Sequence, residues 1–428
     1  MQTHFTPERL TEPGMIEAEQ ILRACVHCGF CTATCPTYVT LGNELDSPRG
    51  RIALIKDMFE EGRAADAQVA LHLDRCLGCL ACTTTCPSGV DYAHLLETAR
   101  THVEATYIRP WQDRWLRSLL AAVLTRPTAF RLALVGARLA RPLARLLPQA
   151  SPLAAMLRLS PASLPRPQSP APSPTAARKV ILLQGCAQSV LDPGINAAAV
   201  RLLARAGVQV ITVAQEGCCG ALPQHMGRTE QAKTLARHNI ALWIAHLDAG
   251  AEAILTTTSG CGTSVKDWGH LFKGDPLQDQ AARVAAQTLD ITEYLVRLTL
   301  PAPRPLPPLK VAYHAACSLQ HGQKITAPPK ALLTTAGFTL VEPAESHLCC
   351  GSAGTYNLLQ PQIAAQLGQR KAAALRRTGA DLVAAGNIGC LTQIAAHAGP
   401  PVLHTVQLLD WAYGGPRPDM LAEQGLLG

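Results

Sequence analysis

Aromatic residues are scarce in this sequence, and the usual nucleotide-binding motifs are missing from it. Phe, Trp and Tyr make up 4% of 428 residues, too few to favour a platform for stacking nucleic-acid bases. The net charge of +7 is also too small to indicate a nucleic-acid partner. No P-loop is present, and no G-x-G-x-x-G motif follows a predicted strand. No Ser/His/Asp arrangement is recognisable, so we expect neither a catalytic residue nor a flavin site on this chain.

Long apolar runs are missing as well. No uncharged apolar stretch of about 18 residues occurs, so we expect no segment that spans a bilayer. The first residues, MQTHFTPERL, are polar or charged where a secretory signal would be apolar. We therefore expect a cytoplasmic location. Thiols stay reduced there, so the 16 cysteines indicate metal or redox chemistry and not a disulfide framework.

Proline-rich stretches divide the chain. One semi-rigid linker runs from Ser160 to Pro174, and a second runs from Pro301 to Pro308. We expect a multidomain protein of mixed α+β class, in which a helical ferredoxin-type domain precedes a duplicated α/β domain. The expected regions are the helical domain at 1–100, an Arg-rich helical segment with its linker at 101–178, and α/β domains at 179–300 and 309–428.

The two C-terminal regions are copies of one unit. In each copy, 31 residues separate a first cysteine from an adjacent cysteine pair, and a Gly-Ala motif precedes the last cysteine by an equal interval. Each cysteine falls where a predicted strand ends, the edge at which open α/β sheets bind ligands. Gly207 and Gly337 each lie between a predicted helix and a predicted strand, the usual place for a left-handed residue. The matched cysteines are Cys186, Cys218, Cys219 and Cys261, and Cys317, Cys349, Cys350 and Cys390.

The other eight cysteines form two identical motifs, each C-x2-C-x2-C-x3-C-P. This is the bacterial ferredoxin pattern, in which three close cysteines bind one [4Fe–4S] cluster and the fourth binds the other. We therefore predict two clusters with crossed ligands. The first is assigned to Cys25, Cys28, Cys31 and Cys86, and the second to Cys76, Cys79, Cys82 and Cys35.

Structural zinc is the alternative for these motifs, because C-x2-C pairs also bind zinc. Zinc takes four ligands per ion and does not call for three equally spaced cysteines followed by Cys-Pro, repeated. The interval of about 40 residues between the motifs is longer than in compact ferredoxins. It indicates the helical two-cluster type found within larger redox complexes.

The chain resembles the glycolate oxidase iron–sulfur subunit. The resemblance rests on LRACVHCGFCTATCPTY, SPRGRIALIK, LDRCLGCLACTTTCPSGV, EGCCGA, TTSGCG and HLCCGSAGTY. It extends from Ile21 to about Trp411 and is thinner between 101 and 178. The two CCG motifs narrow the range of similar proteins to one superfamily. It includes the CCG-containing subunit of heterodisulfide reductase and lactate-utilisation iron–sulfur proteins.

The resemblance implies an electron-transfer subunit that joins FAD-binding partner subunits. Glycolate would be oxidised to glyoxylate at FAD on a partner, and electrons would pass through the two clusters to an acceptor such as quinone. The isolated chain would then be inactive. Two alternatives stay open: a lactate-utilisation or heterodisulfide-reductase-like complex with catalysis at the CCG domains, and a zinc-stabilised scaffold.

The eight CCG cysteines are candidates for an additional metal or redox site. Related CCG proteins hold an iron–sulfur cluster or a metal there, often with one more cysteine in a terminal C-x2-C. Here that position is Ser264 in the first copy and Gln393 in the second, so each copy offers four thiols. A simpler metal site and burial as small apolar residues are both open.

Four residues near the ferredoxin motifs have two interpretations each. Arg49 and Arg51 either orient an acidic partner or cluster loop, or lie on a surface helix that begins after Pro48. We expect His27 and His94 to be hydrogen-bonded packing residues and not ligands.

An arginine-rich stretch runs from Arg109 to Arg145, with eight arginines and one acidic residue. A basic amphipathic helix of this kind either lies on an anionic membrane or packs against partner chains. In the first case the protein would be peripheral on the cytoplasmic face of the inner membrane, close to quinone.

Overall fold

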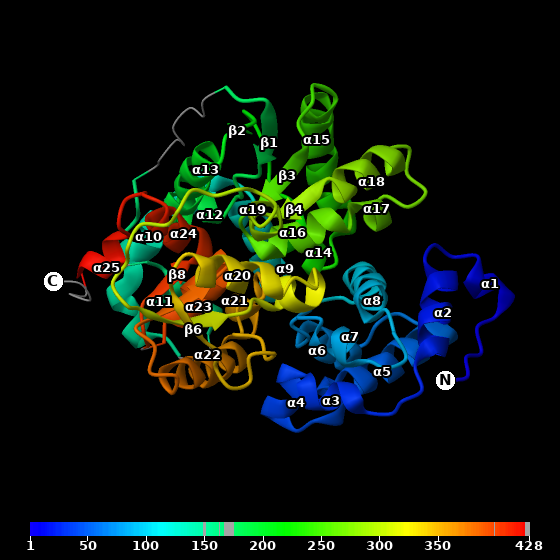
Figure 1. The fold of residues 1–428 in the computed structure, drawn as a ribbon. Helices are drawn as coiled ribbons and strands as arrows, with labels where there is room; N and C mark the ends of the chain where they lie inside the picture. The colour runs from blue at the N-terminus through cyan, green and yellow to red at the C-terminus, as the bar shows by residue number, and fades with distance from the viewer. Residues whose placement is uncertain (149–150, 162, 167–174, 398, 424–428) are drawn as a thin grey trace.

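The computed structural model describes residues 1–148, 151–161, 163–166, 175–397 and 399–423. Helices make up the N-terminal part, and two four-stranded parallel sheets with their own helices follow it (Figure 1). The predicted fold class, a helical domain before a duplicated α/β domain, is confirmed. Most of the predicted linker between Ser160 and Pro174 lies outside the described residues.

Several of the N-terminal helices, α5 and α6 among them, begin at residues whose side chains accept hydrogen bonds from the free backbone N–H groups. The Ser47 hydroxyl accepts a hydrogen bond from the N–H of Gly50 at 2.9 Å, and Pro48 is the first residue of α5. Asp66 likewise accepts from the N–H of Val69 at 2.8 Å. The elements are α1 (Pro7–Leu10), α2 (Met15–Ala24), α3 (Phe30–Thr34), α4 (Pro36–Leu41), η1 (Glu44–Asp46), α5 (Pro48–Glu61), α6 (Ala67–Asp74), α7 (Ala81–Thr85) and α8 (Tyr92–Thr106).

The arginine-rich stretch forms two helices, where the sequence led us to expect one. α9 (Trp111–Leu124) ends before Pro127, which begins α10 (Pro127–Ala140), since proline lacks the N–H that a continuous helix needs at that point. Within the described residues no single helix has the length and apolar character to cross a bilayer, although α9 and α10 would qualify as a pair bent by 116°. The segment continues as η2 (Arg141–Leu146) and α11 (Pro152–Leu159).

Each α/β half has a fully parallel sheet of the same topology. The strand orders are β2-β1-β3-β4 and β6-β5-β7-β8. β3 and β7 are buried along their whole length, as expected for central strands covered on both faces. The strands are β1 (Arg178–Leu182), β2 (Val208–Ile211), β3 (Ala253–Thr256), β4 (Thr288–Asp290), β5 (Lys310–His314), β6 (Thr339–Val341), β7 (Leu382–Ala385) and β8 (Val402–His404).

The helices of the two halves follow the same repeat. Gly207 and Gly337, at the predicted helix ends, have φ of 73° and 96°, which confirms the left-handed prediction. In the first half the helices are α12 (Gln188–Leu191), α13 (Gly194–Arg205), α14 (Ala221–His225), α15 (Thr229–Asp248), α16 (Ser259–Lys266), α17 (Trp268–Leu271), α18 (Gln278–Ala286) and α19 (Ile291–Leu295). In the second they are η3 (Ser318–Gly322), α20 (Ala327–Thr335), α21 (Tyr356–Leu359), α22 (Pro361–Arg376), α23 (Ile388–Ala395), α24 (Thr405–Ala412) and α25 (Asp419–Glu423).

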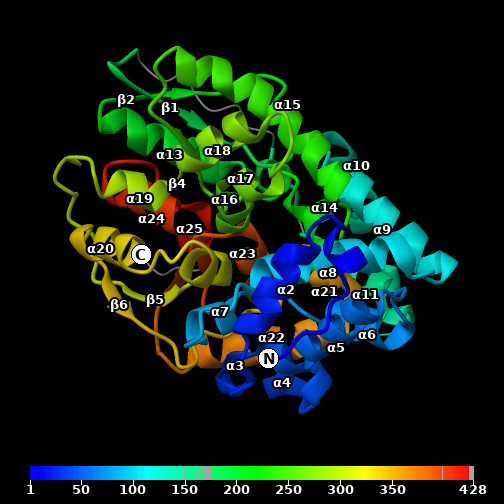
Figure 2. The same ribbon diagram turned by 90° about the vertical axis from the view of Figure 1, so that its right-hand side faces the viewer.

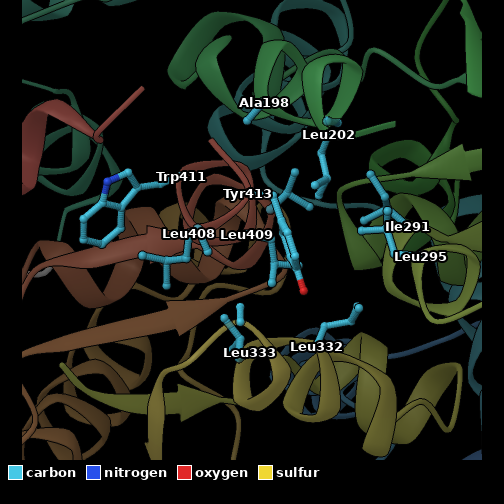
Figure 3. Close-up of a cluster of buried hydrophobic side chains, with 14 of the residues drawn as sticks. Ala198, Leu202, Ile291, Leu295, Leu332, Leu333, Leu408, Leu409, Trp411 and Tyr413 are labelled. Atoms are coloured by element: carbon cyan, nitrogen blue, oxygen red, sulfur yellow. The ribbon is translucent and has the colours of Figure 1, made fainter. Parts of the chain in front are cut away.

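The largest hydrophobic core joins the two halves (Figure 3). α13 packs against α24, and α19 packs against α20, so an early helix of each half meets a late helix of the other. Arg201 and Arg205 of α13 form ion pairs with the buried Asp410 of α24 at 2.6 Å. These helix contacts and ion pairs hold the two halves together.

The carboxyl ends of the two sheets face each other. His404, at the end of β8, hydrogen-bonds the Thr257 carbonyl after β3 at 2.8 Å. The hydroxyls of Ser259 and Ser318 are 2.7 Å apart. The N-terminal domain packs beside this edge, with α8 against α14 and α7 against η3 (Figure 2). Cysteines from all three units therefore lie in neighbouring parts of the molecule.

Candidate metal centres

A first cavity in the N-terminal domain is lined by three cysteines of the first motif and two of the second. Cys25 ends α2, Cys31 lies in α3, and Cys86 ends α7. α3 and α7 pack together, which brings Cys86 to the side of the first motif. The cysteines that line it are Cys25, Cys28, Cys31 and Cys86, with Cys82 in the wall shared with the second cavity.

A second cavity combines the motifs in the opposite way. It is lined by Cys35, Cys76, Cys79 and Cys82, together with Arg51 and Tyr92. Cys35 reaches it because it ends α3 and begins α4, where Pro36 is the first helical residue. The second cavity is thus lined by four thiols, three from the second motif and one from the first, whereas five thiols line the first cavity. The ligand set of each cluster stays a prediction, and Cys82 lines both cavities.

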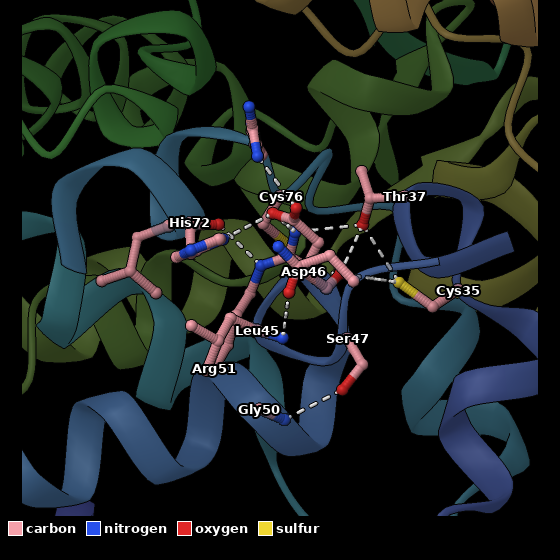
Figure 4. Close-up of polar contacts among 12 residues, drawn as sticks. Cys35, Thr37, Leu45, Asp46, Ser47, Gly50, Arg51, His72 and Cys76 are labelled. Carbon is pink, nitrogen blue, oxygen red and sulfur yellow. Dashed lines mark hydrogen bonds and ion pairs between the residues drawn. The ribbon is translucent and has the colours of Figure 1, made fainter. Parts of the chain in front are cut away.

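The second cavity is bordered by a buried polar network centred on Arg51, which is 1% exposed (Figure 4). Its Nε donates to the His72 carbonyl at 2.7 Å, and its other nitrogens lie 3.0 Å from the Thr37 hydroxyl and 3.8 Å from Cys35 Sγ. The buried Asp46 carboxylate lies 3.6 Å from Arg51. Arg51 is thus a positioning residue beneath the Cys35 loop. Helix α5 does begin at Pro48, but this face of it is not on the surface.

Charge and burial act in opposite directions on the thiols. Burial disfavours the Cys76 thiolate, but the positive charges of Arg51 and Arg100 outweigh it and lower the pKa of Cys76. Burial, reinforced by neighbouring thiols, raises the pKa of Cys79 and Cys82 well above the usual value, and that of Cys31 to about 11. Crowded thiols of this kind ionise when a cation binds them. When the shared Cys82 is given to the second cavity, as predicted, each cavity has four thiols, the ligand number of a [4Fe–4S] cluster, so the donor sets fit that cofactor.

The two cavities differ in their exposure. Beside the first, Val26 and Phe30 are 65% and 63% exposed, and Cys28 is exposed as well. At the second, Cys35, Cys76 and Cys82 are buried and Cys79 is half-buried, whereas among the cysteines that line the first cavity alone Cys25 is the one that is buried. The first cavity therefore lies at the molecular surface, and the second lies inside the protein.

The second cavity also adjoins the C-terminal half. Leu77 and Cys79 pack in one apolar cluster with Cys317, Cys349 and Tyr356. The Tyr356 hydroxyl donates to the Arg75 carbonyl at 3.1 Å. On α7, the Thr84 hydroxyl lies 2.7 Å from Nδ1 of His321. The ferredoxin motif and the second CCG motif thus meet directly.

In the first α/β half, the four predicted cysteines lie together after the strand ends. Cys186 Sγ is 3.3 Å from Cys218 Sγ, and Cys219 is hydrogen-bonded to both Cys218 and Cys261. Ser264 donates to the Gln224 side chain at 3.0 Å. The neighbouring thiol of Cys218, together with burial, raises the pKa of Cys186 well above its ordinary value. Three of the four thiols are buried, and Cys261 is half-buried.

In the second half, a histidine lies beside the equivalent cysteines. Cys317 Sγ lies 3.7 Å from Cys349 Sγ. The ligand atoms of His314, Cys350 and Cys390 all lie within 4.8 Å of one another. Gln393 accepts from Asn357 at 3.1 Å and donates to the Ala364 carbonyl at 3.0 Å, so it is held away as a structural amide.

His314 was missed by sequence reasoning. It ends β5, a strand that begins with Lys310 and is buried from Val311 onward, and it is 1% exposed. Neither Nδ1 nor Nε2 has a hydrogen-bond partner among the described residues. Burial, together with the charge of Lys371, lowers the pKa of His314 to about 3, so the imidazole is neutral at pH 7. A comparison of the two copies could have identified His314, because Leu183 stands at the equivalent position in the first copy.

Three other polar residues near the motifs, His94, His27 and Arg49, differ in their hydrogen-bond partners. The His94 nitrogens lie 2.6 Å from Asp91 and 2.9 Å from Asp267, so His94 is a hydrogen-bonded packing residue as predicted. Nε2 of His27 is buried without a partner in the described part of the chain, which differs from our expectation. Arg49 pairs with Glu44 at 2.8 Å near the surface.

Family models and known proteins were compared with the chain. The model of the 4Fe-4S dicluster domain matches residues 21–90, and that of the cysteine-rich CCG domain matches 180–266 and 311–395. The glycolate oxidase iron-sulfur subunit of Escherichia coli is 43% identical over 96% of this chain and 99% of its own length. The probable glycolate oxidase iron-sulfur subunit of Bacillus subtilis is 33% identical, with 86% and 87% covered.

More distant matches are also present. Lactate utilization protein A of Exiguobacterium is 30% identical over 54% of this chain and 96% of its own length. The crystal structure of a hypothetical protein from Helicobacter pylori matches with a TM-score of 0.55 and 11% identity, over 99% of this chain and 76% of the other. At that identity the similarity concerns the fold alone.

Proposed function

Because the chain belongs to the glycolate oxidase iron–sulfur subunit family, we propose that it carries electrons from a partner-subunit FAD to an acceptor such as quinone. The electrons would come from the oxidation of glycolate to glyoxylate at that FAD. The observation that carries the proposal is the pair of adjoining cavities, each lined by at least four cysteines drawn from both motifs. When bound there, [4Fe–4S] clusters supply one-electron carriers.

A different role is proposed for each cavity. Cys25, Cys28, Cys31 and Cys86 would hold the cluster near the surface, where a partner can approach Val26 and Phe30. Cys35, Cys76, Cys79 and Cys82 would hold the buried cluster. Burial disfavours net negative charge at the second site, and Arg51 offsets that charge from a distance of 3.8 Å to Cys35 Sγ. Electrons would enter at the first site and continue through the second.

The first test is composition followed by turnover. The anaerobically purified chain should contain at least about eight irons and eight sulfides, and no flavin. It should show no glycolate-dependent dye reduction alone, and should support that reduction when FAD-binding partner subunits are added. Glycolate turnover by the isolated, flavin-free chain would contradict the proposal. A colourless zinc protein would contradict it as well.

We further propose that α9 and α10 rest on the cytoplasmic face of an anionic membrane. Both helices lie along one edge of the molecule (Figure 2). Each carries an apolar stripe in spite of exposure, with Trp111 68% and Leu132 74% exposed. Exposed arginines accompany the stripes, and that combination favours an anionic bilayer surface. The residues are Trp111, Trp115, Leu119, Leu132, Val135 and Leu139, with Arg114, Arg126, Arg138 and Arg141.

Two arginines of the stretch do not take part in that surface. Arg109 and Arg117 are buried and form ion pairs with Asp74 at 2.6 and 2.7 Å. They fix α9 to the N-terminal domain, so the outer arginines are presented on a rigid support. Sedimentation with vesicles should show binding that needs anionic lipid and that Trp111→Ser with Trp115→Ser weakens. Ile16→Ser, at an exposed position on α2, is the matched control. Equal partitioning onto neutral and anionic vesicles would contradict membrane docking.

A further inference from the structure

The second α/β half contains a buried histidine with no hydrogen-bond partner. A buried imidazole normally has a partner for at least one ring nitrogen, because an unsatisfied polar atom costs about 1–3 kcal/mol. His314 has none on either nitrogen, among the described residues, although it ends a central strand and is 1% exposed. The ring instead faces the thiols of Cys350 and Cys390, all three ligand atoms lying within 4.8 Å of one another. Three donor atoms this close together could bind one metal ion.

The donors around His314 prefer particular metals. Cys317 and Cys349 lie beside this trio, with their sulfurs 3.7 Å apart, so the second half offers four thiols and one imidazole. Thiolate with imidazole is a ligand set for iron or zinc, whereas magnesium and calcium take oxygen ligands. No carboxylate belongs to the trio.

The first half lacks both features that single out the second. At the position of His314, three residues before the first cysteine, it has the buried Leu183. A second difference concerns charge. In each half an alanine packs on the glycine that follows the cysteine pair: Ala232 on Gly220 in the first half, and Ala364 on Gly351 in the second. Seven residues after this alanine, the first half has Asn239 and the second half has Lys371. Lys371 is 2% exposed and interacts electrostatically with Cys349, Cys350 and Cys390, whereas Asn239 only hydrogen-bonds the backbone of Gly217 and Cys218.

A buried lysine beside thiols is costly unless it faces negative charge. Its Nζ donates to the Glu345 carbonyl at 2.7 Å, which satisfies one proton and leaves the charge to be balanced. Metal-bound thiolates carry the negative charge that would balance it. The extra ligand and the extra positive charge therefore occur in the same half.

From these features we infer that the second half alone binds a thiolate-preferring metal centre, containing iron or zinc, with His314, Cys350 and Cys390 among its ligands. The inference rests on the proposed function, because it adds a third centre to the two in the N-terminal domain. The centre would adjoin the buried ferredoxin cavity, since Cys79 packs with Cys317 and Cys349.

The repeat supplies the controls for the experiment. Iron, zinc and sulfide are measured on the full-length chain and on three single variants. These are His314→Leu, Cys350→Ala, and Cys219→Ala, which changes the equivalent cysteine of the first half. His314→Leu installs the residue that the first half already carries, which favours correct folding. Metal beyond the eight irons is expected in the parent chain and in Cys219→Ala. Most of it should be lost from His314→Leu and from Cys350→Ala.

The electron paramagnetic resonance (EPR) spectra of the two ferredoxin clusters separate the possible failures. Those two spectra should be present and unchanged in all four proteins. Eight irons with both spectra and no further metal would overturn the third centre and leave the proposed function standing. Absence of the two spectra from the parent chain would overturn the proposed function itself. Extra metal that persists in His314→Leu, or that disappears from Cys219→Ala, would also overturn the inference.

Discussion

The two cysteine-lined cavities of the N-terminal domain share one motif and differ in almost everything around it. The first opens beside Val26 and Phe30, which are largely exposed. The second is enclosed by the Arg51 network and by the second CCG motif. Identical spacing therefore fixes which ligands are available, while the surrounding residues decide whether a site meets a partner or the interior. In the proposed electron path, electrons would therefore pass from the surface cavity to the interior one.

Replacing Arg51 should have the largest effect. Its removal leaves Asp46 with less compensation and takes a positive charge from beside Cys35, at a cost of about 3–5 kcal/mol. We expect Arg51→Met to lower the unfolding free energy by that amount and to lose iron from the buried site before the surface site. Iron analysis with chemical denaturation measures both.

Arg49→Met is the matched control for Arg51→Met. Arg49 stands two positions earlier on the same helix and forms its ion pair near the surface, with Glu44. Its loss should cost less than about 1 kcal/mol. Equal destabilisation by the two variants would remove the distinction between the cavities.

A smaller, kinetic effect is expected at the surface cavity. Val26→Ala with Phe30→Ala should slow electron acceptance from the FAD-bearing partner by about tenfold, since exposed apolar side chains at an interface supply much of its binding energy. Iron content and the cluster spectra should not change. Stopped-flow measurement of cluster reduction in the assembled complex provides the rate.

Ile16→Ala on α2, also exposed but outside the cavity lining, serves as the control for the surface pair. It should leave the rate unchanged. If the surface pair behaved like Ile16, the partner would have to approach elsewhere.

The smallest effect concerns His94, which lies outside both cavities. Burial opposes its charge, but the carboxylates of Asp267 and Asp91 outweigh it and raise the pKa of His94 to about 10. A raised folded pKa contributes stability that is complete below the unfolded value of about 6.5 and is lost as pH rises through about 10. His94→Gln should remove this part of the pH dependence. Urea unfolding of both proteins across that range measures it, and parallel stability curves would show that His94 contributes none.

Sequence reasoning succeeded where the relevant pattern is local or repeated. The two α/β copies, their left-handed Gly207 and Gly337, and the family itself followed from spacing and motif. The structure confirmed the fold class because strand and helix patterns in each copy agree with how the chain packs. Such features depend on neighbours in the sequence.

It failed where burial depends on distant segments. Arg51 looks like a residue on the first turn of a helix, and only the fold places it beneath the Cys35 loop. His314 ends a strand that also contains Lys310 and Tyr313, and its role depends on Cys350 and Cys390, which lie in the segments that follow β6 and β7. Comparing the two copies position by position would have singled it out.

The crossed assignment of ligands is the central claim, and reciprocal serine variants test it most directly. In anaerobic, dithionite-reduced samples, EPR with iron analysis should show that Cys35→Ser damages the buried cluster and spares the surface one. Cys86→Ser should do the opposite, although each cysteine belongs to the other motif by sequence. Loss of the surface cluster alone in Cys35→Ser, with loss of the buried cluster alone in Cys86→Ser, would contradict the account.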